Sequence, residues 1–306
     1  MKVLVATDKP FAPVAVKGIR EVIEGAGFGF ELLEKYSEKN KLIKAVAKAD
    51  AVIIRSDIID RQVLEAAANL KIVVRAGAGY DNVDLEAASE KGICVMNTPG
   101  QNSNAVAELA LGMMVYAMRN MFNGTSGAEL KGKVLGIHAY GNVGRCVARI
   151  AKGFGMEVYA YDPYCRADLF ENDGVKVFCR LEDLYEKCQI VSLHIPATDE
   201  TRKCINAELL GRMPKNAILV NTARKEVIDE TSLMMLMENR GDFKYITDIM
   251  PAADAKFAEK FPGRYFSTPK KMGAQTAEAN INAGIAAAKQ IVGFFKEDNQ
   301  TFRVNP

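Results

Sequence analysis

The chain has 306 residues, of which 49% are apolar and 25% are charged, the composition of a globular protein of about two domains. Its formal net charge is only +2, which argues against the strongly basic surface that nucleic acids or anionic membranes require. No apolar run approaches the ~18 residues of a membrane span, and charged residues come too early for a signal peptide. Six scattered cysteines without a C-x-x-C pair predict free thiols in a reducing cytoplasm and no metal site.

Short β-branched runs alternate with helical patterns over the first hundred residues. Strands are expected at 2–7, 51–56, 71–77 and 93–99, and helices at 14–27, 41–49, 61–70 and 83–92. This alternation is typical of a parallel sheet covered by helices on both faces. A long helix rich in Ala, Leu and Met is expected at about 104–120, followed by a polar, glycine-containing linker at 123–132.

The same pattern begins again at Lys133. A strand at 133–141, a helix at 142–155 and a strand at 156–164 are followed by expected strands at 189–196, 216–223, 243–249 and 264–269. One more long helix is expected at 276–296. The sequence therefore predicts a second α/β unit. Periodicity alone does not assign the last helix to either unit.

The turn after the strand at 133–141 carries the strongest local signal. Ala139, Gly141 and Gly144 stand where a G-x-G-x-x-G dinucleotide-binding turn has its glycines. Asp162 ends the next strand, where a carboxylate binds the ribose 2′-OH and repels a 2′-phosphate, so NAD is expected rather than NADP. The alternative is that the turn only joins a strand to a helix and that Asp162 is a turn residue. The strand–turn–helix–strand context favours the dinucleotide site.

Six ordered segments resemble the D-isomer-specific 2-hydroxyacid dehydrogenase family, and most closely its D-3-phosphoglycerate dehydrogenase branch. They begin with RAGAGYDNVD and continue with GIHAYGNVGR, YAYDPY, SLHIPATDE, NTARKEVIDE and TPKKMGAQT. The resemblance implies two Rossmann-like, doubly wound parallel-sheet lobes, with the nucleotide lobe inserted into the substrate lobe. The substrate-binding lobe would comprise 1–97 and 275–306, and the NAD-binding lobe 98–274.

The resemblance also implies roles for individual residues. Arg224 matches the catalytic arginine, whose planar fork suits a carboxylate or keto oxygen. Gly77, Ala78 and Gly79 match the loop that holds the substrate carboxylate, and Arg55 and Arg75 match positions that contact phosphate. Contacts to NAD are implied, besides the glycine turn, at Asn142, Val143, Asp162, His194, Ile195, Thr222, Ala223 and Asp248.

The chain departs from the family at the acid/base. Relatives have a histidine in a P-H-x-G-A segment, held by a glutamate, whereas 269–274 here read P-K-K-M-G-A and Ala252–Ala253 stand near the glutamate's place. An ammonium group has no tautomer to fix, so a lysine needs no such partner. Counting forward from Pro269 selects Lys270, which we slightly prefer, and counting back from Gly273 selects Lys271. The alternative is that both lysines are solvated and the protein is inactive.

The predicted function is NAD-dependent oxidation of D-3-phosphoglycerate to 3-phosphohydroxypyruvate, the first step of the phosphorylated route to L-serine. One alternative is another D-2-hydroxyacid dehydrogenase, such as a hydroxypyruvate/glyoxylate reductase or a D-lactate enzyme. The other is a catalytically dead, NAD-sensing binding protein. The expected partners are a small phosphorylated hydroxy acid and a second copy in a homodimer, although the linker at 123–132 is shorter than the family's dimer arm. No regulatory domain is expected after Pro306.

Overall fold

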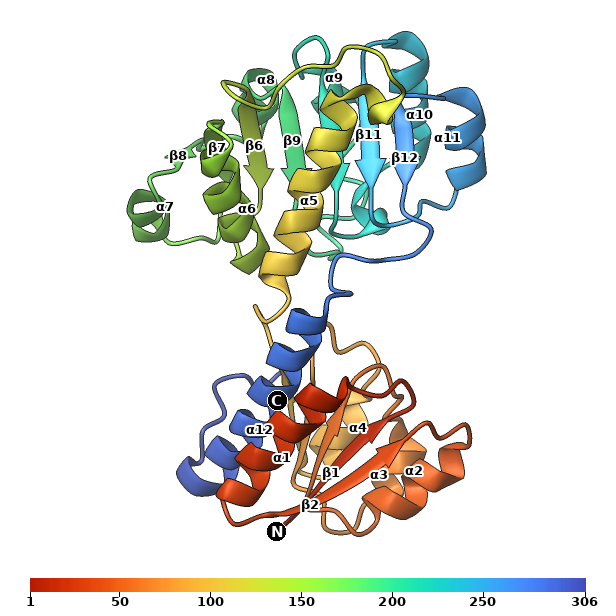
Figure 1. Cartoon of the computed structure of the whole chain (residues 1–306), viewed down its shortest axis with the longest axis vertical. Coiled ribbons are helices and arrows are strands. Elements are labelled where there is room, and N and C mark those ends of the chain that lie inside the picture. Colours follow the sequence, from red (N-terminus) through yellow and green to blue (C-terminus); the bar gives the residue numbers. More distant parts are fainter. The chain divides into compact units, whose positions relative to one another are not determined.

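The computed structural model describes residues 1–306 as two compact units. Unit 1 comprises Met1–Asn102 and Thr276–Pro306, and unit 2 comprises Ser103–Gln275. Unit 2 is thus inserted into the sequence of unit 1 (Figure 1). The first boundary lies at Asn102, a few residues beyond the one at 97 that the family resemblance implied. None of the helices combines the length and the apolar character that a membrane crossing requires.

Unit 1 contains a five-stranded parallel sheet in the order β2-β1-β3-β4-β5. Its strands are β1 (Lys2–Thr7), β2 (Gly29–Glu34), β3 (Ala51–Ile54), β4 (Ile72–Arg75) and β5 (Cys94–Asn97). Its helices are α1 (Pro13–Gly25), α2 (Lys39–Val46), α3 (Arg61–Ala66), α4 (Leu85–Glu90) and α12 (Ala277–Glu297). The order reverses between β1 and β3, so the loops after these two strands flank the crevice where such sheets bind ligands.

Unit 2 contains a seven-stranded parallel sheet in the order β12-β11-β10-β9-β6-β7-β8. Its strands are β6 (Val134–His138), β7 (Glu157–Tyr161), β8 (Lys176–Val177), β9 (Ile190–Leu193), β10 (Ile218–Asn221), β11 (Lys244–Thr247) and β12 (Tyr265–Ser267). Its α-helices are α5 (Ser103–Met118), α6 (Asn142–Gly153), α7 (Ala167–Asp173), α8 (Leu181–Lys187), α9 (Ala207–Gly211), α10 (Glu230–Asn239) and α11 (Asp254–Lys260). Short 3₁₀ turns lie at Asn120–Phe122 and Lys225–Val227. This order reverses between β6 and β9, as in a Rossmann fold.

Both sheets are buried on both faces, which confirms the predicted fold class. Strands such as β3 (AVII), β9 (IVSL) and β10 (ILVN) are buried at every position, because helices cover each face of a doubly wound sheet. Two apolar clusters fill the two faces of each unit. Side-chain caps fix the start of five helices: Asp60, Asp84, Asn206, Asp229 and Thr276 each accept a hydrogen bond from the first turn.

The last helix, α12, packs in unit 1 against α1. Glycines allow a close approach of the two helices: a Cβ on Gly284 would lie 2.8 Å from Ile19 Cδ1, and one on Gly18 would lie 2.9 Å from Ile285 Cδ1. A Cβ at this distance would force the neighbouring side chain to shift. The close packing of α1 against α12 therefore requires small residues at these two positions. The last helix therefore belongs to unit 1, an assignment that periodicity alone could not make.

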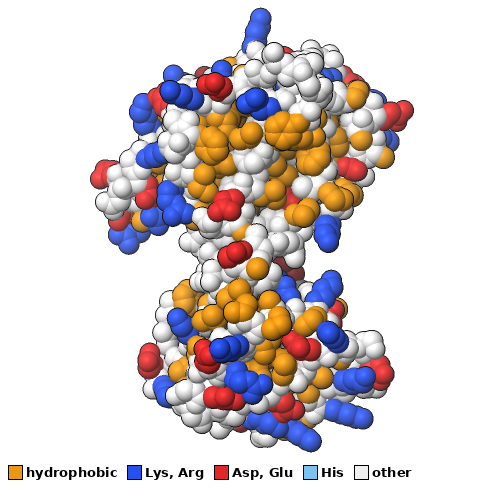
Figure 2. All heavy atoms as spheres, viewed as in Figure 1, with side chains coloured by type: hydrophobic (Ala, Val, Ile, Leu, Met, Phe, Trp, Pro, Cys, Tyr) orange, Lys and Arg blue, Asp and Glu red, His pale blue; other side chains and the backbone are white.

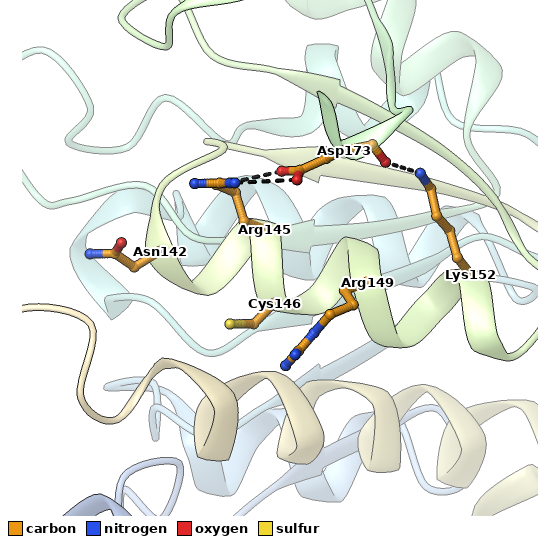
Figure 3. Close-up of a pocket in the computed structure, with 6 residues that line it drawn as sticks. All are labelled: Asn142, Arg145, Cys146, Arg149, Lys152 and Asp173. Carbon is orange, nitrogen blue, oxygen red and sulfur yellow. Dashed lines mark hydrogen bonds and ion pairs between the residues drawn. The ribbon is translucent and has the colours of Figure 1, made fainter. Parts of the chain in front are cut away.

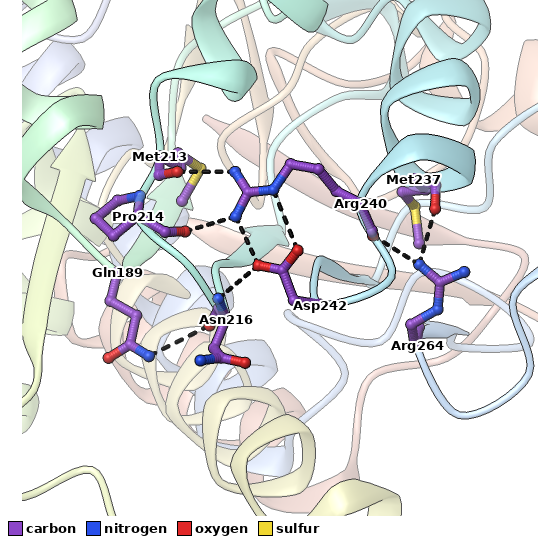
Figure 4. A network of polar contacts seen from close by, with 8 residues as sticks. All are labelled: Gln189, Met213, Pro214, Asn216, Met237, Arg240, Asp242 and Arg264. Carbon is purple, nitrogen blue, oxygen red and sulfur yellow. Dashed lines mark hydrogen bonds and ion pairs between the residues drawn. The ribbon is translucent and has the colours of Figure 1, made fainter.

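A polar network closes the amino-terminal edge of the unit 2 sheet (Figure 4). Arg240 donates to the carbonyl oxygens of Met213 (2.8 Å) and Pro214 (2.7 Å) and pairs with Asp242 at 2.7 Å. Asp242 also accepts the backbone N–H of Asn216 at 2.6 Å. These bonds join the loops that enter β10 and β11, at the end of the sheet away from the candidate site. We assign the network to stability.

The network predicts an acid-dependent loss of stability. Its hydrogen bond from Arg240 lowers the pKa of Asp242 to about 2. A depressed carboxyl pKa stabilises the fold above the unfolded value of about 4, and this contribution is lost as the pH falls toward the folded value. Asp242→Asn should therefore lower the thermal unfolding midpoint near neutral pH, and the gap to wild type should narrow below about pH 4. A gap that stays constant across this range would contradict the assignment.

Candidate functional site

The turn after β6 has the geometry of a dinucleotide-binding turn. Ala139 adopts a left-handed conformation with φ of 77°, the conformation that glycine tolerates best. A Cβ on Gly144 would lie 2.4 Å from the carbonyl oxygen of Ala139, so only glycine lets α6 pack this close to the strand. A Cβ on Gly141 would meet nothing within 4 Å. Space for a phosphate therefore remains above the amino terminus of α6, where N–H groups and the helix dipole favour anions.

Asp162 lies at the carboxyl end of β7, beside this turn. Its Oδ2 accepts the backbone N–H of Tyr140 at 2.8 Å, and its Oδ1 accepts that of Tyr164 at 2.9 Å. Each carboxylate oxygen has a second lone pair, so the group can still accept a ribose hydroxyl. The carboxylate thus both closes the turn and presents negative charge at its rim.

The groove along the outer face of α6 has a supporting role (Figure 3). Arg145 donates to both carboxylate oxygens of Asp173, at 2.7 and 3.2 Å, and Tyr140 donates to the same carboxylate at 3.0 Å. Lys152 donates to the carbonyl oxygens of Asp173 and Gly174. These bonds hold α7 against α6 and the glycine turn. The cations of the groove are therefore engaged within the unit.

The remaining predicted cofactor contacts follow β9, β10 and β11 at the same edge of the sheet. Ile195, Thr222 and Ala223 are buried, while Asn142 at the start of α6 is exposed. Thr222 Oγ1 is buried without a hydrogen-bond partner, which is costly unless a ligand satisfies it. The open turn, the Asp162 carboxylate and this orphaned hydroxyl fit a bound dinucleotide.

Neither histidine has the environment of an acid/base. Nδ1 of His138 lies 3.1 Å from the Tyr185 hydroxyl, and Nε2 of His194 lies 2.9 Å from Ser192 Oγ. Burial lowers the pKa of His138 to about 4, against the attraction of Asp162. Burial and then repulsion from His138 lower the pKa of His194 to about 3. Both imidazoles are consequently neutral near pH 7.

Arg224 follows β10 and is held by its own backbone. The buried Asn221 donates to the Arg224 carbonyl oxygen at 3.0 Å, and Arg224 Nη1 donates to the Ala223 carbonyl oxygen at 2.8 Å. The other guanidinium N–H groups have no partner within unit 2. A half-buried fork of this kind can bind a carboxylate or a keto oxygen.

Lys270 and Lys271 lie on the segment after β12, and both are exposed. The segment folds over Asp248, whose carboxylate is 1% exposed. Thr268 Oγ1 and the Met272 N–H donate to Oδ1, and the Gly273 N–H donates to Oδ2, each at 2.8 Å. The structure therefore gives Asp248 three donors from its own chain.

In unit 1, the loop after β4 packs directly against the side chain of Arg75. Gly77 has φ of +149°, and a Cβ there would lie 1.5 Å from Arg75 Nη1, so the guanidinium occupies the space that a side chain would need. Arg75 Nε donates to the Arg55 carbonyl oxygen at 3.0 Å, and its Nη1 and Nη2 have no partner within unit 1. The N–H groups of Ala78 and Gly79 are likewise unpaired within unit 1. These donors suit a polyanionic ligand.

The guanidinium of Arg55 forms its hydrogen bonds within unit 1. Its Nη1 donates to the carbonyl oxygens of Lys9 and Pro10, both at 3.1 Å, and its Nη2 donates to Asn280 Oδ1 at 2.6 Å. Burial and then repulsion from Arg55 lower the pKa of Arg75. The two guanidinium groups are thus close enough to repel each other, and an anion bound beside them would relieve this repulsion.

Sequence reasoning missed Asp57, which joins the loops after β1, β2 and β3. The carboxylate is 5% exposed and accepts the N–H groups of Asp8 (2.7 Å) and Arg55 (3.2 Å), as well as the Tyr36 hydroxyl. Burial and then this hydrogen bond raise the pKa of Tyr36. The available signal was a carboxylate directly after a buried strand.

Residues 103–264 match the model of the D-isomer specific 2-hydroxyacid dehydrogenase, NAD binding domain. The chain belongs to this family. The match covers most of unit 2 and confirms the predicted cofactor, NAD, for the domain that contains the glycine turn.

Relatives extend the similarity over nearly the whole chain. A D-3-phosphoglycerate dehydrogenase of Methanocaldococcus jannaschii is 37% identical over 275 residues, which are 83% of this chain and 51% of the relative. A hydroxypyruvate reductase of Thermotoga maritima is 35% identical over 87% of this chain and 90% of the relative. The chain thus spans about half of the first relative and most of the second.

A solved structure of cofactor (NAD+)-bound 3-phosphoglycerate dehydrogenase from Entamoeba histolytica is 48% identical, with a TM-score of 0.87. The match covers 100% of this chain and 99% of that chain. It therefore includes the residues of both units.

Asp162 should decide between the two nicotinamide cofactors. Asp162→Ala should weaken NADH binding and relax discrimination against NADPH, because the ribose loses its acceptor and a 2′-phosphate loses its repulsion. Asp162→Asn keeps an acceptor oxygen without the charge, so it should lose discrimination more than NADH affinity. Fluorescence titration with both cofactors measures this. Unchanged preference in both variants, with exposed Asp168→Asn as control, would show that Asp162 does not face the ribose.

Proposed function

We propose that this protein oxidises D-3-phosphoglycerate to 3-phosphohydroxypyruvate with NAD, as the entry step of a phosphorylated route to serine. The observation that carries the substrate assignment is Arg75, a half-buried guanidinium with unpaired outer nitrogens beside a second arginine. A phosphate dianion is a suitable ligand for such a pair. The neighbouring N–H groups of Ala78 and Gly79 are suited to the substrate carboxylate.

The residues of unit 2 support proton and hydride chemistry. Oxidation removes a hydride from carbon 2 and a proton from its hydroxyl, and NAD supplies the hydride acceptor. Arg224 is suited to holding the substrate oxygen and to stabilising negative charge on it. Lys270 or Lys271, as the neutral amine, accepts the hydroxyl proton and returns it in the reverse direction. The neutral state of both histidines near pH 7 supports assigning this task to a lysine.

A hydroxypyruvate reductase is the second candidate, because the Thermotoga relative with that name matches over most of both chains. An unphosphorylated keto acid does not require the Arg55–Arg75 pair, so these arginines favour the phosphorylated substrate. A catalytically dead NAD sensor is the third candidate, motivated by the missing histidine and glutamate. Arg224 and the intact carboxylate loop speak against it, since a sensor needs neither.

The homodimer and the cytoplasmic location belong to the same proposal. Leu109, Val115 and Tyr116 lie partly exposed on α5, and Phe122 beyond it is 67% exposed. The Tyr116 ring lies 5.2 Å from that of Phe122 and 4.9 Å from that of Phe266. Figure 2 shows apolar side chains gathered on this face of unit 2. An apolar face of this kind suits a second copy of the chain, and the six free cysteines suit a reducing compartment.

The phosphate assignment predicts a substrate-selective defect. If the contact is a desolvated charge pair, Arg75→Ala should weaken binding of phosphohydroxypyruvate by about 2–5 kcal/mol. Its KM should then rise roughly 30-fold or more. Arg75→Lys should recover only part of this, because it lacks the planar fork. Unphosphorylated hydroxypyruvate should be affected much less. NADH consumption measures both reactions.

Arg55→Ala should give the same selectivity, with an added effect from the loop at Lys9–Pro10 that Arg55 holds. Arg61→Ala is the matched control, because Arg61 pairs with Glu90 on the surface of unit 1 at 2.5 Å. Equal losses on both substrates would point to a folding role for Arg75 and would reject the phosphorylated substrate.

The lysine assignment predicts that one of two adjacent residues carries turnover. Either Lys270→Ala or Lys271→Ala should lower kcat ~10²–10⁴-fold, the usual contribution of general acid–base catalysis, with NADH binding kept. The other variant and Lys256→Ala, an exposed lysine on α11, should remain near wild type. If His138→Ala or His194→Ala abolished turnover while both lysine variants stayed active, a histidine would be the acid/base instead.

A further inference from the structure

The segment with the two lysines is fastened at both ends to a single carboxylate. Asp248 Oδ1 accepts one hydrogen bond from Thr268 Oγ1, before the lysines, and one from the Met272 N–H, after them. Asp248 Oδ2 accepts a hydrogen bond from the Gly273 N–H. Thr268 Oγ1 also lies 3.2 Å from the Asp248 carbonyl oxygen. Lys270 and Lys271 lie between these attachment points. The position of either amine therefore depends on Asp248.

The carboxylate is suited to this task because it is buried. A buried charge is stable only when hydrogen bonds replace its water, and the three donors all come from this segment. Hydrogen bonds to an ionised acceptor are stronger than neutral ones. With the segment in place, Asp248 is 1% exposed, and the three donors replace the water that its carboxylate has lost.

The close approach of the segment depends on Gly273. A Cβ at this position would lie 3.1 Å from Asp248 Oδ2 and 3.2 Å from Val106 Cγ2 on α5. Both distances are tighter than ordinary contact, so a Cβ at 273 would press against Asp248 and against Val106 on α5 at the same time. A side chain at 273 would lengthen the hydrogen bond from the Gly273 N–H. Gly273 therefore offers a second way to disturb the same anchor.

We propose that Asp248 is a positioning residue that holds the lysine segment in place for proton transfer. The family resemblance also implies a direct contact of Asp248 with NAD, and Oδ2, which accepts one hydrogen bond, leaves room for it. The carboxylate's bonds to Thr268, Met272 and Gly273 support the positioning role in addition. This inference rests on the proposed function, because it needs a lysine that moves the substrate proton.

Backbone amide exchange tests the anchor without relying on activity. Asp248→Asn puts an amide where two carboxylate oxygens accept, so at least one of the Met272 and Gly273 N–H groups loses its acceptor. Hydrogen exchange at 272–273 should accelerate, and native-state trypsin cleavage after Lys270 or Lys271 should increase. Gly273→Ala should do the same more weakly. Asp229→Asn, which removes another carboxylate that accepts backbone N–H groups, should leave 268–273 unchanged.

A double-mutant cycle then tests positioning. Asp248→Asn should lower kcat by about 10²-fold at saturating NADH, as expected when a reacting group is displaced by about 1 Å. In the background of the lysine variant that has lost turnover, the same change should cost little, because there is no amine left to position. Additive losses in the two backgrounds would overturn the proposal.

The remaining outcomes also decide the matter. A weaker NADH affinity with unchanged kcat and unchanged exchange at 272–273 would make Asp248 a cofactor contact and would overturn the inference. If wild type fails to turn over any keto acid, the proposed function fails. The exchange experiment then still reports whether Asp248 anchors the segment.

Discussion

A buried carboxylate at the carboxyl edge of each sheet holds the loops that carry the predicted chemistry. In unit 2, Asp248 gathers donors from the segment after β12, and in unit 1, Asp57 gathers donors from the loops after β1, β2 and β3. Both carboxylates are almost fully buried, so losing these hydrogen bonds would leave a desolvated charge. Parallel strands deliver all of these loops to one edge. The hydrogen bonds to the two carboxylates then hold these loops in fixed positions.

The arginine pair of unit 1, Arg55 and Arg75, shows the complementary situation, in which a positive charge has no carboxylate partner. Arg55 is satisfied by carbonyl oxygens and by Asn280, whereas the outer nitrogens of Arg75 face no partner within the unit. Burial and the neighbouring cation both disfavour the charged form of Arg75. An anionic ligand would remove part of this penalty on binding. Under the proposed function, this arrangement would favour a phosphorylated substrate over an unphosphorylated one.

Much of this organisation follows from the sequence, because buried parallel strands are continuous apolar runs and doubly wound order places their ends together. The edge strands were missed for the same reason: β2 carries Glu31 and Glu34, and β8 has only Lys176 and Val177, both exposed. Ala139, which stands at a glycine position of the dinucleotide-binding turn, adopts the left-handed conformation that glycine tolerates best. Apart from the Arg55 N–H, the groups that donate to Asp57 and Asp248 lie 20 or more positions away in the sequence, so no local pattern could predict these hydrogen bonds.

The exchange of histidine for lysine is the central claim, because it separates a working dehydrogenase from an inactive relative. Its most direct test is the pH dependence of D-3-phosphoglycerate oxidation by the wild-type protein, followed as NADH formation. A lysine base predicts a rate that still rises well above ~6.5, the reference pKa of histidine, because the neutral amine must form before it can accept the proton. NADH binding without turnover at any pH, or a rate that levels off just above the histidine range, would contradict this account.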